Sequence, residues 1–144
     1  MRWPIRSMDR ILVDTSALYA LIDKNDSHHA EAAKILASVL PHSPQLVVPN
    51  FLLAETHTII NRRIGPREAL RFLKGALLDY QIERVTVEDE HRAVAMLQRI
   101  SVSRDLSYFD VVAAALAERL GIEEVFTFDR HFALLRLKPI VATR

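Results

Sequence analysis

The pattern of the whole chain is set by one stretch, Ile11-Leu12-Val13-Asp14-Thr15-Ser16-Ala17-Leu18. Its three consecutive apolar residues predict a short buried strand over 11–13, which Asp14 ends. The residues from Thr15 to Ile22 then predict a short helix. A buried strand that passes through an acid directly into a helix is the kind of unit from which α/β folds are built.

The rest of the chain continues this alternation of strands and helices. We predict further strands over 46–48, 80–87, 124–128 and 137–141, and helices over 27–40, 51–63, 66–78, 88–100 and 107–120, with a short helix after Asp129. Asp26 or Ser27 is expected to cap the second helix, Asn50 the third, and Gly121 to end the last long one. Such alternation implies right-handed crossovers, so the sequence predicts an α/β fold with a parallel sheet of about five strands covered on both faces.

Length and composition favour one domain over residues 8–144. Half of the 144 residues are hydrophobic, which is enough for a single packed core. Residues 1–7 are too short and polar for a signal peptide, so we expect an N-terminal arm, an alternative start or an expression remnant. No apolar run reaches the roughly 18 residues that span a bilayer, and we expect a cytoplasmic protein without membrane partners.

Charge and cysteine content exclude several function classes. The formal net charge is +1, so any surface that binds nucleic acid must be local. The absence of cysteine excludes disulfides, thiol nucleophiles and cysteine-based metal sites.

Two acids follow predicted strands. Asp14 closes the first strand and Asp129 the fourth, and parallel strands bring both to the same edge of the sheet, where ligands bind in such folds. The alternative for each is a helix N-cap, a role that is compatible with a chemical one.

Two further acids lie near the starts of helices. Glu55 shares its helix face with Leu52 and Ile59, and a carboxylate among apolar side chains needs a partner cation or a metal, unless it leans into water near the helix N-terminus. Asp110 follows Ser107 at the spacing of a capping box, which is the strong alternative for this residue.

Together, the four acids predict a metal centre. Carboxylates gathered at one edge of the sheet would repel one another, and Mg²⁺ or Mn²⁺, which prefer oxygen ligands, would relieve the repulsion. Such ions can generate hydroxide and stabilise the departing oxygen of a phosphodiester.

The motifs around these acids resemble those of PIN-domain nucleases, and most closely the VapC-type toxins of toxin–antitoxin pairs. The matching segments, in the family's order, are Val13-Asp14-Thr15-Ser16-Ala17-Leu18, Ala54-Glu55, Leu106-Ser107-Tyr108-Phe109-Asp110 and Phe126-Thr127-Phe128-Asp129-Arg130-His131-Phe132. Phe109 departs from the family, in which a small or hydroxyl residue often precedes the third acid.

The resemblance implies a three-layer α/β/α sandwich and Mg²⁺- or Mn²⁺-dependent cleavage of RNA. It assigns catalysis and metal binding to Asp14, Glu55, Asp110 and Asp129, with Ser16 and Thr127 as supporting hydroxyls. It also implies an antitoxin partner and a homodimer. A housekeeping RNA-processing nuclease without an antitoxin remains the alternative within the family.

Other features are open to more than one interpretation. Arg67, Arg71 and Lys74 share one helix face and could contact RNA phosphates, or could simply be solvated. Tyr108, Phe109 and Phe132 could stack on bases or pack in the core. The six histidines lack zinc-site spacing, and His131 is expected at the surface.

Two other function classes are weaker alternatives. A receiver-like signalling module also has an acidic Mg²⁺ pocket, and Lys138-Pro139 fits it, but Asp14 is followed by Thr15 rather than by a second acid. A catalytically inactive binding module would have no need of four acids.

Overall fold

The computed structural model describes residues 9–100 and 105–141, so the expected arm at residues 1–7 lies outside the described part. Its elements in chain order are β1 Arg10–Val13, α1 Thr15–Ile22, α2 His29–Val39, η1 Leu40–His42, β2 Gln45–Pro49, α3 Asn50–Arg63, α4 Pro66–Asp79, β3 Gln81–Glu83, α5 Val87–Arg99, α6 Tyr108–Arg119, β4 Glu124–Phe126, η2 Arg130–Leu135 and β5 Lys138–Pro139. Along the described ranges, no helix is both long and apolar enough to cross a membrane.

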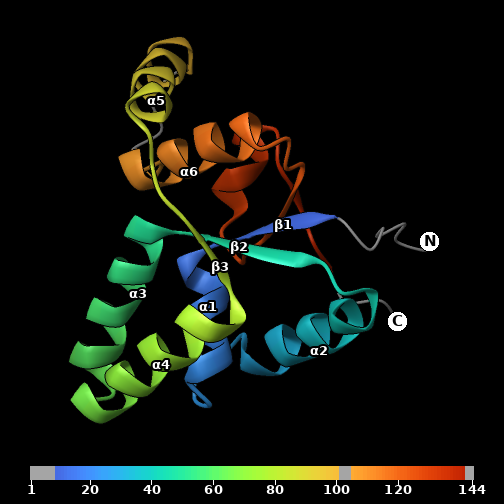
Figure 1. The fold of residues 1–144 in the computed structure, drawn as a ribbon, viewed down its shortest axis with the longest axis vertical. Helices are drawn as coiled ribbons and strands as arrows, with labels where there is room; N and C mark the ends of the chain where they lie inside the picture. Colours follow the sequence, from blue (N-terminus) through green and yellow to red (C-terminus); the bar gives the residue numbers. More distant parts are fainter. Residues whose placement is uncertain (1–8, 101–104, 142–144) are drawn as a thin grey trace.

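The strands form one parallel sheet in the order β3-β2-β1-β4-β5. Leu12 in the central strand pairs with Val47 of β2 on one side and with Val125 of β4 on the other. The sheet lies between two helical layers, with α5 and α6 on one face and α1 to α4 on the other (Figure 1). This arrangement confirms the predicted three-layer α/β/α sandwich and its five-stranded parallel sheet.

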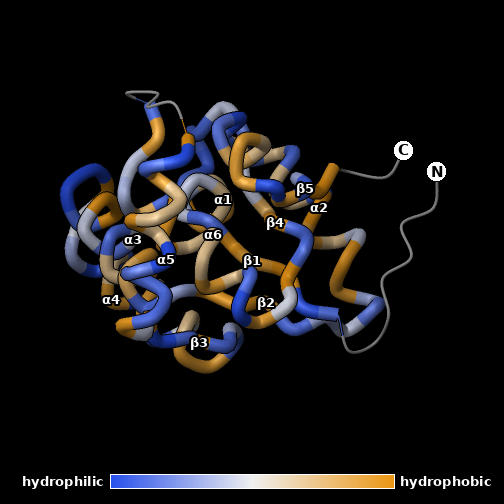
Figure 2. Tube along the Cα trace, turned by 90° about the horizontal axis from the view of Figure 1, so that it is seen from above, coloured by the Kyte–Doolittle hydropathy of each residue, from blue (hydrophilic) through white to orange (hydrophobic). Residues whose placement is uncertain are grey.

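Strict alternation along the strands divides the core in two. Ile11 and Val13 point toward the helices α1 to α4, while Leu12 and Val125 point toward α5, α6 and η2. These side chains are almost completely buried, because a sheet covered on both faces needs apolar residues at every position. Figure 2 shows the hydrophobic residues of β1 and β2 in the middle of the molecule and more hydrophilic residues on the outer helices.

Several strands are shorter than the sequence predicts. The third covers only Gln81–Glu83, and the fifth only Lys138–Pro139, because both are edge strands with a single pairing partner. The fourth ends at Phe126 rather than at Phe128. The next two residues leave the ladder, and Thr127 turns its hydroxyl toward the end of β1, where it bonds Asp14.

Two of the predicted caps are wrong. Pro49, not Asn50, is the N-cap of α3, and the Asn50 amide oxygen accepts a hydrogen bond from the backbone N–H of Val85, 3.1 Å away. The N-cap of α2 is His28, because the Asp26 carboxylate forms a local turn instead and accepts the N–H of His28. The predicted left-handed Gly121 after α6 is confirmed, with φ of 70°.

A partly buried ion pair joins α5 to α6. Asp89 is 2% exposed and accepts two hydrogen bonds from the Arg119 guanidinium, at 2.9 and 3.0 Å. Asp89 also completes a capping box with Thr86 at the start of α5. The pair therefore links the start of α5 to the end of α6.

Candidate active site

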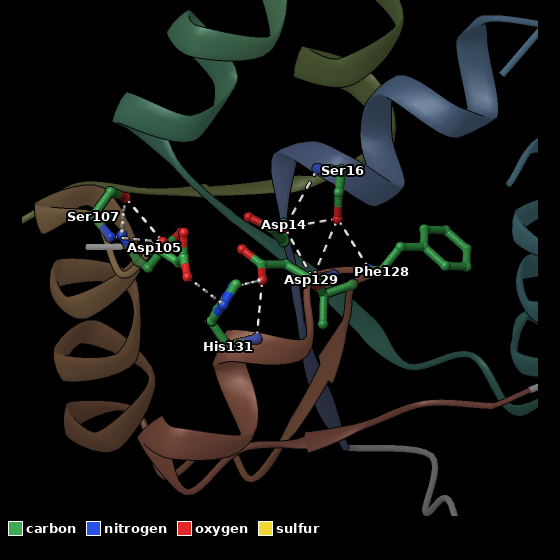
Figure 3. Close-up of polar contacts among 9 residues, drawn as sticks. Asp14, Ser16, Asp105, Ser107, Phe128, Asp129 and His131 are labelled. Atoms are coloured by element: carbon green, nitrogen blue, oxygen red, sulfur yellow. Dashed lines mark hydrogen bonds and ion pairs between the residues drawn. The ribbon is translucent and has the colours of Figure 1, made fainter. Parts of the chain in front are cut away.

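The carboxyl ends of β1 and β4 lie side by side at the centre of the sheet. From β1 the chain continues to β2 and β3 on one side of β1, and then crosses to β4 and β5 on the other side. The strand order therefore reverses between β1 and β4. Ligands of open parallel sheets bind at such a switch point. Asp14 and Asp129 follow the two strands, and Figure 3 shows them side by side there.

Asp14 is held by a set of hydroxyl groups. Its Oδ2 accepts hydrogen bonds from the Ser16 hydroxyl at 2.8 Å, the Thr127 hydroxyl at 2.9 Å and the Ser16 backbone N–H at 3.3 Å. The side chain therefore caps α1 as the capping alternative predicted. Its Oδ1 has no hydrogen bond among the described residues, which leaves that oxygen for another ligand.

The same two hydroxyls tie the β1 and β4 ends together. The Ser16 hydroxyl accepts the backbone N–H of Phe128 at 3.0 Å, and the Thr127 hydroxyl accepts that of Asp129 at 3.0 Å. Each hydroxyl thus donates to Asp14 and accepts from the loop after β4. Ser16 and Thr127 set the position of Asp14 relative to Asp129.

Glu55 approaches from the second turn of α3, which begins directly after β2. Its side chain is half-buried, and its Oε2 is closed to water yet has no hydrogen-bond partner in the described part of the chain. A buried carboxylate oxygen without a donor is costly. A positive ligand beside this oxygen would therefore be favourable.

Asp110 approaches from the start of α6. Its Oδ2 accepts hydrogen bonds from the backbone N–H and the hydroxyl of Ser107, at 3.1 and 2.9 Å, and the Ser107 hydroxyl accepts the Asp110 N–H in return. The capping box expected from the sequence is confirmed. As at Asp14, one carboxylate oxygen serves the local structure, and Oδ1 has no hydrogen bond within the described ranges.

Asp129 begins η2 and is tied to a histidine. Its Oδ1 accepts the backbone N–H of His131 at 2.9 Å and lies 2.6 Å from the ring Nδ1 of the same residue. The other ring nitrogen of His131 lies 3.6 Å from the carboxylate of Asp105 (Figure 3). His131 thus bridges the loop before α6 and the loop after β4.

The carboxylates influence one another electrostatically. Burial raises the pKa of Glu55, and the charges of Asp14 and Asp110 raise it further. Burial also raises the pKa of Asp14 against the hydrogen bonds from Ser16 and Thr127, with Asp110 adding to the rise. The pKa of Asp110 is raised by burial and by Asp129, against the bonds from Ser107 and the influence of His131. These four acids form one mutually repelling cluster.

Comparison with known proteins agrees with this arrangement. Residues 11–137 match the family model described as the PIN domain, a range that contains all four acids and ends just before β5. The chain belongs to the PIN-domain family. The expectation drawn from the four sequence motifs is confirmed at the level of the family.

Curated PIN-domain relatives cover nearly the whole chain. The 23S rRNA-specific endonuclease VapC20 of Mycobacterium tuberculosis is 33% identical over 124 residues, which are 85% of this chain and 92% of that protein. Ribonuclease VapC26 of the same organism is 29% identical over 133 residues, which are 88% and 92% of the two chains.

Solved structures show the same fold. The crystal structure of VapC20 from Mycobacterium tuberculosis, described as a sarcin–ricin loop cleaving toxin, superimposes with a TM-score of 0.81 and 31% identity, covering 91% of this chain and 98% of the other. VapBC2 from Rickettsia felis, bound to a promoter DNA fragment, gives a TM-score of 0.72 at 12% identity, covering 91% and 97%, and supports the fold alone.

The donor set of this PIN-domain site fits a hard divalent cation. The donors of the four acids are carboxylate oxygens, the ligands that such ions prefer. One of these oxygens, Glu55 Oε2, is buried and has no hydrogen-bond partner among the described residues. Among the residues that the structure describes, no three such side chains already stand close enough to hold an ion. A divalent cation would offset the repulsion among the four carboxylates.

Sequence reasoning missed the role of His131. The histidine was expected at the surface, but it orients Asp129 and reaches Asp105. Phe132, a candidate for base stacking, is buried in the core, while Tyr108 and Phe109 are 45% and 47% exposed. The basic residues Arg67, Arg71 and Lys74 are exposed on α4, with Arg71 paired to Glu68 at 3.6 Å.

Proposed function

We propose that this PIN-domain protein is a divalent-metal-dependent endoribonuclease and the toxin of a toxin–antitoxin pair. One observation carries the proposal: four carboxylates from separate segments converge at the switch point, and one of their oxygens, Glu55 Oε2, is buried without a partner. Such a cluster is unfavourable unless it serves a positive ligand.

Asp14, Glu55, Asp110 and Asp129 are the residues that would hold Mg²⁺ or Mn²⁺. When bound, the metal would lower the pKa of a coordinated water and stabilise negative charge on the departing oxygen of a phosphodiester. Carboxylate-only sites suit these hard ions better than zinc or copper.

Neighbouring hydroxyl, imidazole and backbone groups hold three of the carboxylates in fixed orientations. Ser16 and Thr127 hold one oxygen of Asp14, Ser107 holds one oxygen of Asp110, and His131 holds one oxygen of Asp129. In each case the second oxygen remains free of these bonds. Fixing one oxygen limits the rotation of the carboxylate, so less ordering is needed when a ligand binds.

The relatives suggest the substrate and the partner. VapC20 is named a 23S rRNA-specific endonuclease, and its structure is described as that of a sarcin–ricin loop cleaving toxin. We take RNA as the substrate class and the sarcin–ricin loop of 23S rRNA as the first target to test. A neutralising antitoxin, a homodimeric state and a cytoplasmic location belong to the same proposal. The antitoxin is motivated by a toxin–antitoxin complex from Klebsiella pneumoniae that contains a chain of the same fold, with a TM-score of 0.66 and 18% identity.

The test is cleavage of a synthetic sarcin–ricin hairpin and of total RNA. Purified protein should cut RNA in Mn²⁺ or Mg²⁺ and stop in EDTA, and Asp110→Asn should lower the rate at least ~10²-fold, the scale of losing a major electrostatic group. Asp79→Asn, an exposed acid at the end of α4, is the matched control and should cut like wild type. Cleavage that persists in EDTA would refute the metal-dependent mechanism.

A further inference from the structure

Two pairs of stacked rings lie beside the acids, each next to one of them in sequence. Phe109 precedes Asp110 and stacks on Phe51, with the ring centroids 5.9 Å apart and the planes 23° apart. Phe128 precedes Asp129 and stacks on His28, with centroids 4.4 Å apart and planes 9° apart.

The segments that carry Phe109 and Phe128 lie on different sides of Asp14 and Asp129 (Figure 3). Phe109 belongs to the first turn of α6, whose start at Ser107 appears on one side of Asp14 and Asp129 in Figure 3. Phe128 points to the other side, away from α6 and toward α2. An extended ligand strand that runs across Asp14 and Asp129 would therefore pass one ring pair before these acids and the other ring pair after them.

In each pair, the more exposed ring packs on one face against the less exposed ring. Phe109 is 47% exposed although its partner Phe51 is half-buried, and His28 is exposed on the half-buried Phe128. The exposure of Phe109 contrasts with Phe126 and Phe132, which are buried in the core. Exposed flat faces held by a second ring are suited to stacking on another flat group.

We propose that Phe109 on Phe51, and His28 on Phe128, are base-stacking surfaces that hold the nucleotides on either side of the phosphate presented to the acids. Nucleobases are the flat groups that accompany a phosphodiester chain, and stacking on aromatic side chains orders single-stranded nucleic acid without reading its sequence. The proposal rests on the proposed nuclease function for the path of the strand. It adds the contacts that position the strand.

The test measures binding rather than cleavage, so that it succeeds or fails separately from the nuclease proposal. The probes are a fluorescent single-stranded octa-adenylate RNA and an abasic ribose-phosphate octamer of equal charge. Binding is followed by anisotropy with Ca²⁺ present, and the integrity of the RNA is checked on gels.

Wild type should bind the octa-adenylate at least about tenfold more tightly than the abasic octamer. Phe109→Ala and His28→Ala should each weaken octa-adenylate binding about tenfold, equivalent to ~1.4 kcal/mol, and leave abasic binding unchanged. Phe109→Trp and His28→Tyr should keep wild-type affinity, because both preserve a flat ring. Leu40→Ala, which removes a side chain 54% exposed in η1 before β2, is the control and should change neither affinity.

Phe109→Leu, together with thermal melts, separates the loss of stacking from a loss of folding, because leucine has no flat ring but keeps an apolar side chain beside Phe51. Leucine should reproduce the loss on octa-adenylate with little change in melting temperature. Equal losses on both octamers, or no loss on either, would overturn the proposal. The second result would leave these rings as a surface for a protein partner instead.

Discussion

The hydroxyl of Thr127 donates a hydrogen bond of 2.9 Å to Oδ2 of Asp14, across 113 positions of sequence. This bond joins the ends of β1 and β4 at the switch point, and it holds a buried carboxylate in place. Thr127 is itself 5% exposed, so water cannot replace its hydroxyl.

Removing this hydroxyl should impair the site more than the fold. We expect Thr127→Val to lower RNA cleavage about tenfold or more, because a hydrogen bond to a charged group contributes roughly 1.5–3 kcal/mol and the Asp14 carboxylate would lose its orientation. Thr127→Ser, which keeps the hydroxyl, should recover most of the rate. A valine variant as active as wild type would show that Asp14 needs no such orientation.

The partly buried pair between Asp89 and Arg119 should make the free energy of unfolding depend on pH. Burial alone would raise the pKa of Asp89, but the hydrogen bonds from Arg119 and Thr86 together lower it below its ordinary value. A carboxyl with a lowered folded-state pKa stabilises the fold above its unfolded-state pKa, near 3.9, and the contribution is lost as the pH falls through the folded-state value.

We therefore expect Asp89→Asn to cost roughly 1.5–3 kcal/mol of unfolding free energy at pH 7, the contribution of hydrogen bonds to a charged group. The substitution removes the carboxylate that accepts two hydrogen bonds from Arg119, whose guanidinium keeps, among the described acids, only the more distant Glu83, at 3.6 Å. The difference from wild type should shrink below about pH 4. Glu118→Gln, which breaks only the exposed pair with Arg92 at 3.7 Å, should cost less than about 1 kcal/mol. Denaturant unfolding of wild type and both variants across pH measures these differences. A free-energy difference between wild type and Asp89→Asn that stays constant with pH would contradict the lowered pKa of Asp89.

The exposed basic side chains of α4 provide a test of the path of the RNA. If Arg67, Arg71 and Lys74 contact phosphates, replacing all three with glutamine should lower the slope of log affinity against log salt by about 0.7 per lost contact on single strands. The effect should be the same for different RNA sequences, since phosphate contacts carry no sequence information. An unchanged slope would mean that this face is merely solvated.

The elements of the fold could be predicted from local pattern. Runs such as Ile11-Leu12-Val13 reveal buried strands without any knowledge of their partners, and the breaks at Pro66 and Gly121 reveal where helices start and stop. Features that depend on distant partners could not be found in this way. Asn50 fits an N-cap in sequence, yet its amide bonds Val85, 35 residues away.

The same distinction holds at the site. Asp14 and Asp129 were predictable because each follows a buried strand, and parallel strands align their ends. The bridge from His131 to Asp105 depends on how two loops meet, and no spacing in the sequence encodes that meeting. The catalytic and metal-binding roles of the four acids remain predictions.

The proposed function requires Asp14 to belong to a metal site and to be more than a helix cap. Asp and Asn are about equally good N-caps, so Asp14→Asn preserves the cap on α1 and removes one charge from the repelling cluster. In EDTA, the variant should be as stable as wild type, or more stable by roughly 1 kcal/mol.

Adding Mn²⁺ should reverse this order, and thermal melts of the two proteins in EDTA and in Mn²⁺ are the most direct measurement. Wild type should gain about 2.7 kcal/mol when the ion is at a hundredfold excess over its dissociation constant, because the ion binds the folded state alone. The variant, lacking one ligand, should gain much less. A wild-type melting temperature that does not change across millimolar Mn²⁺ would contradict the four-acid metal site.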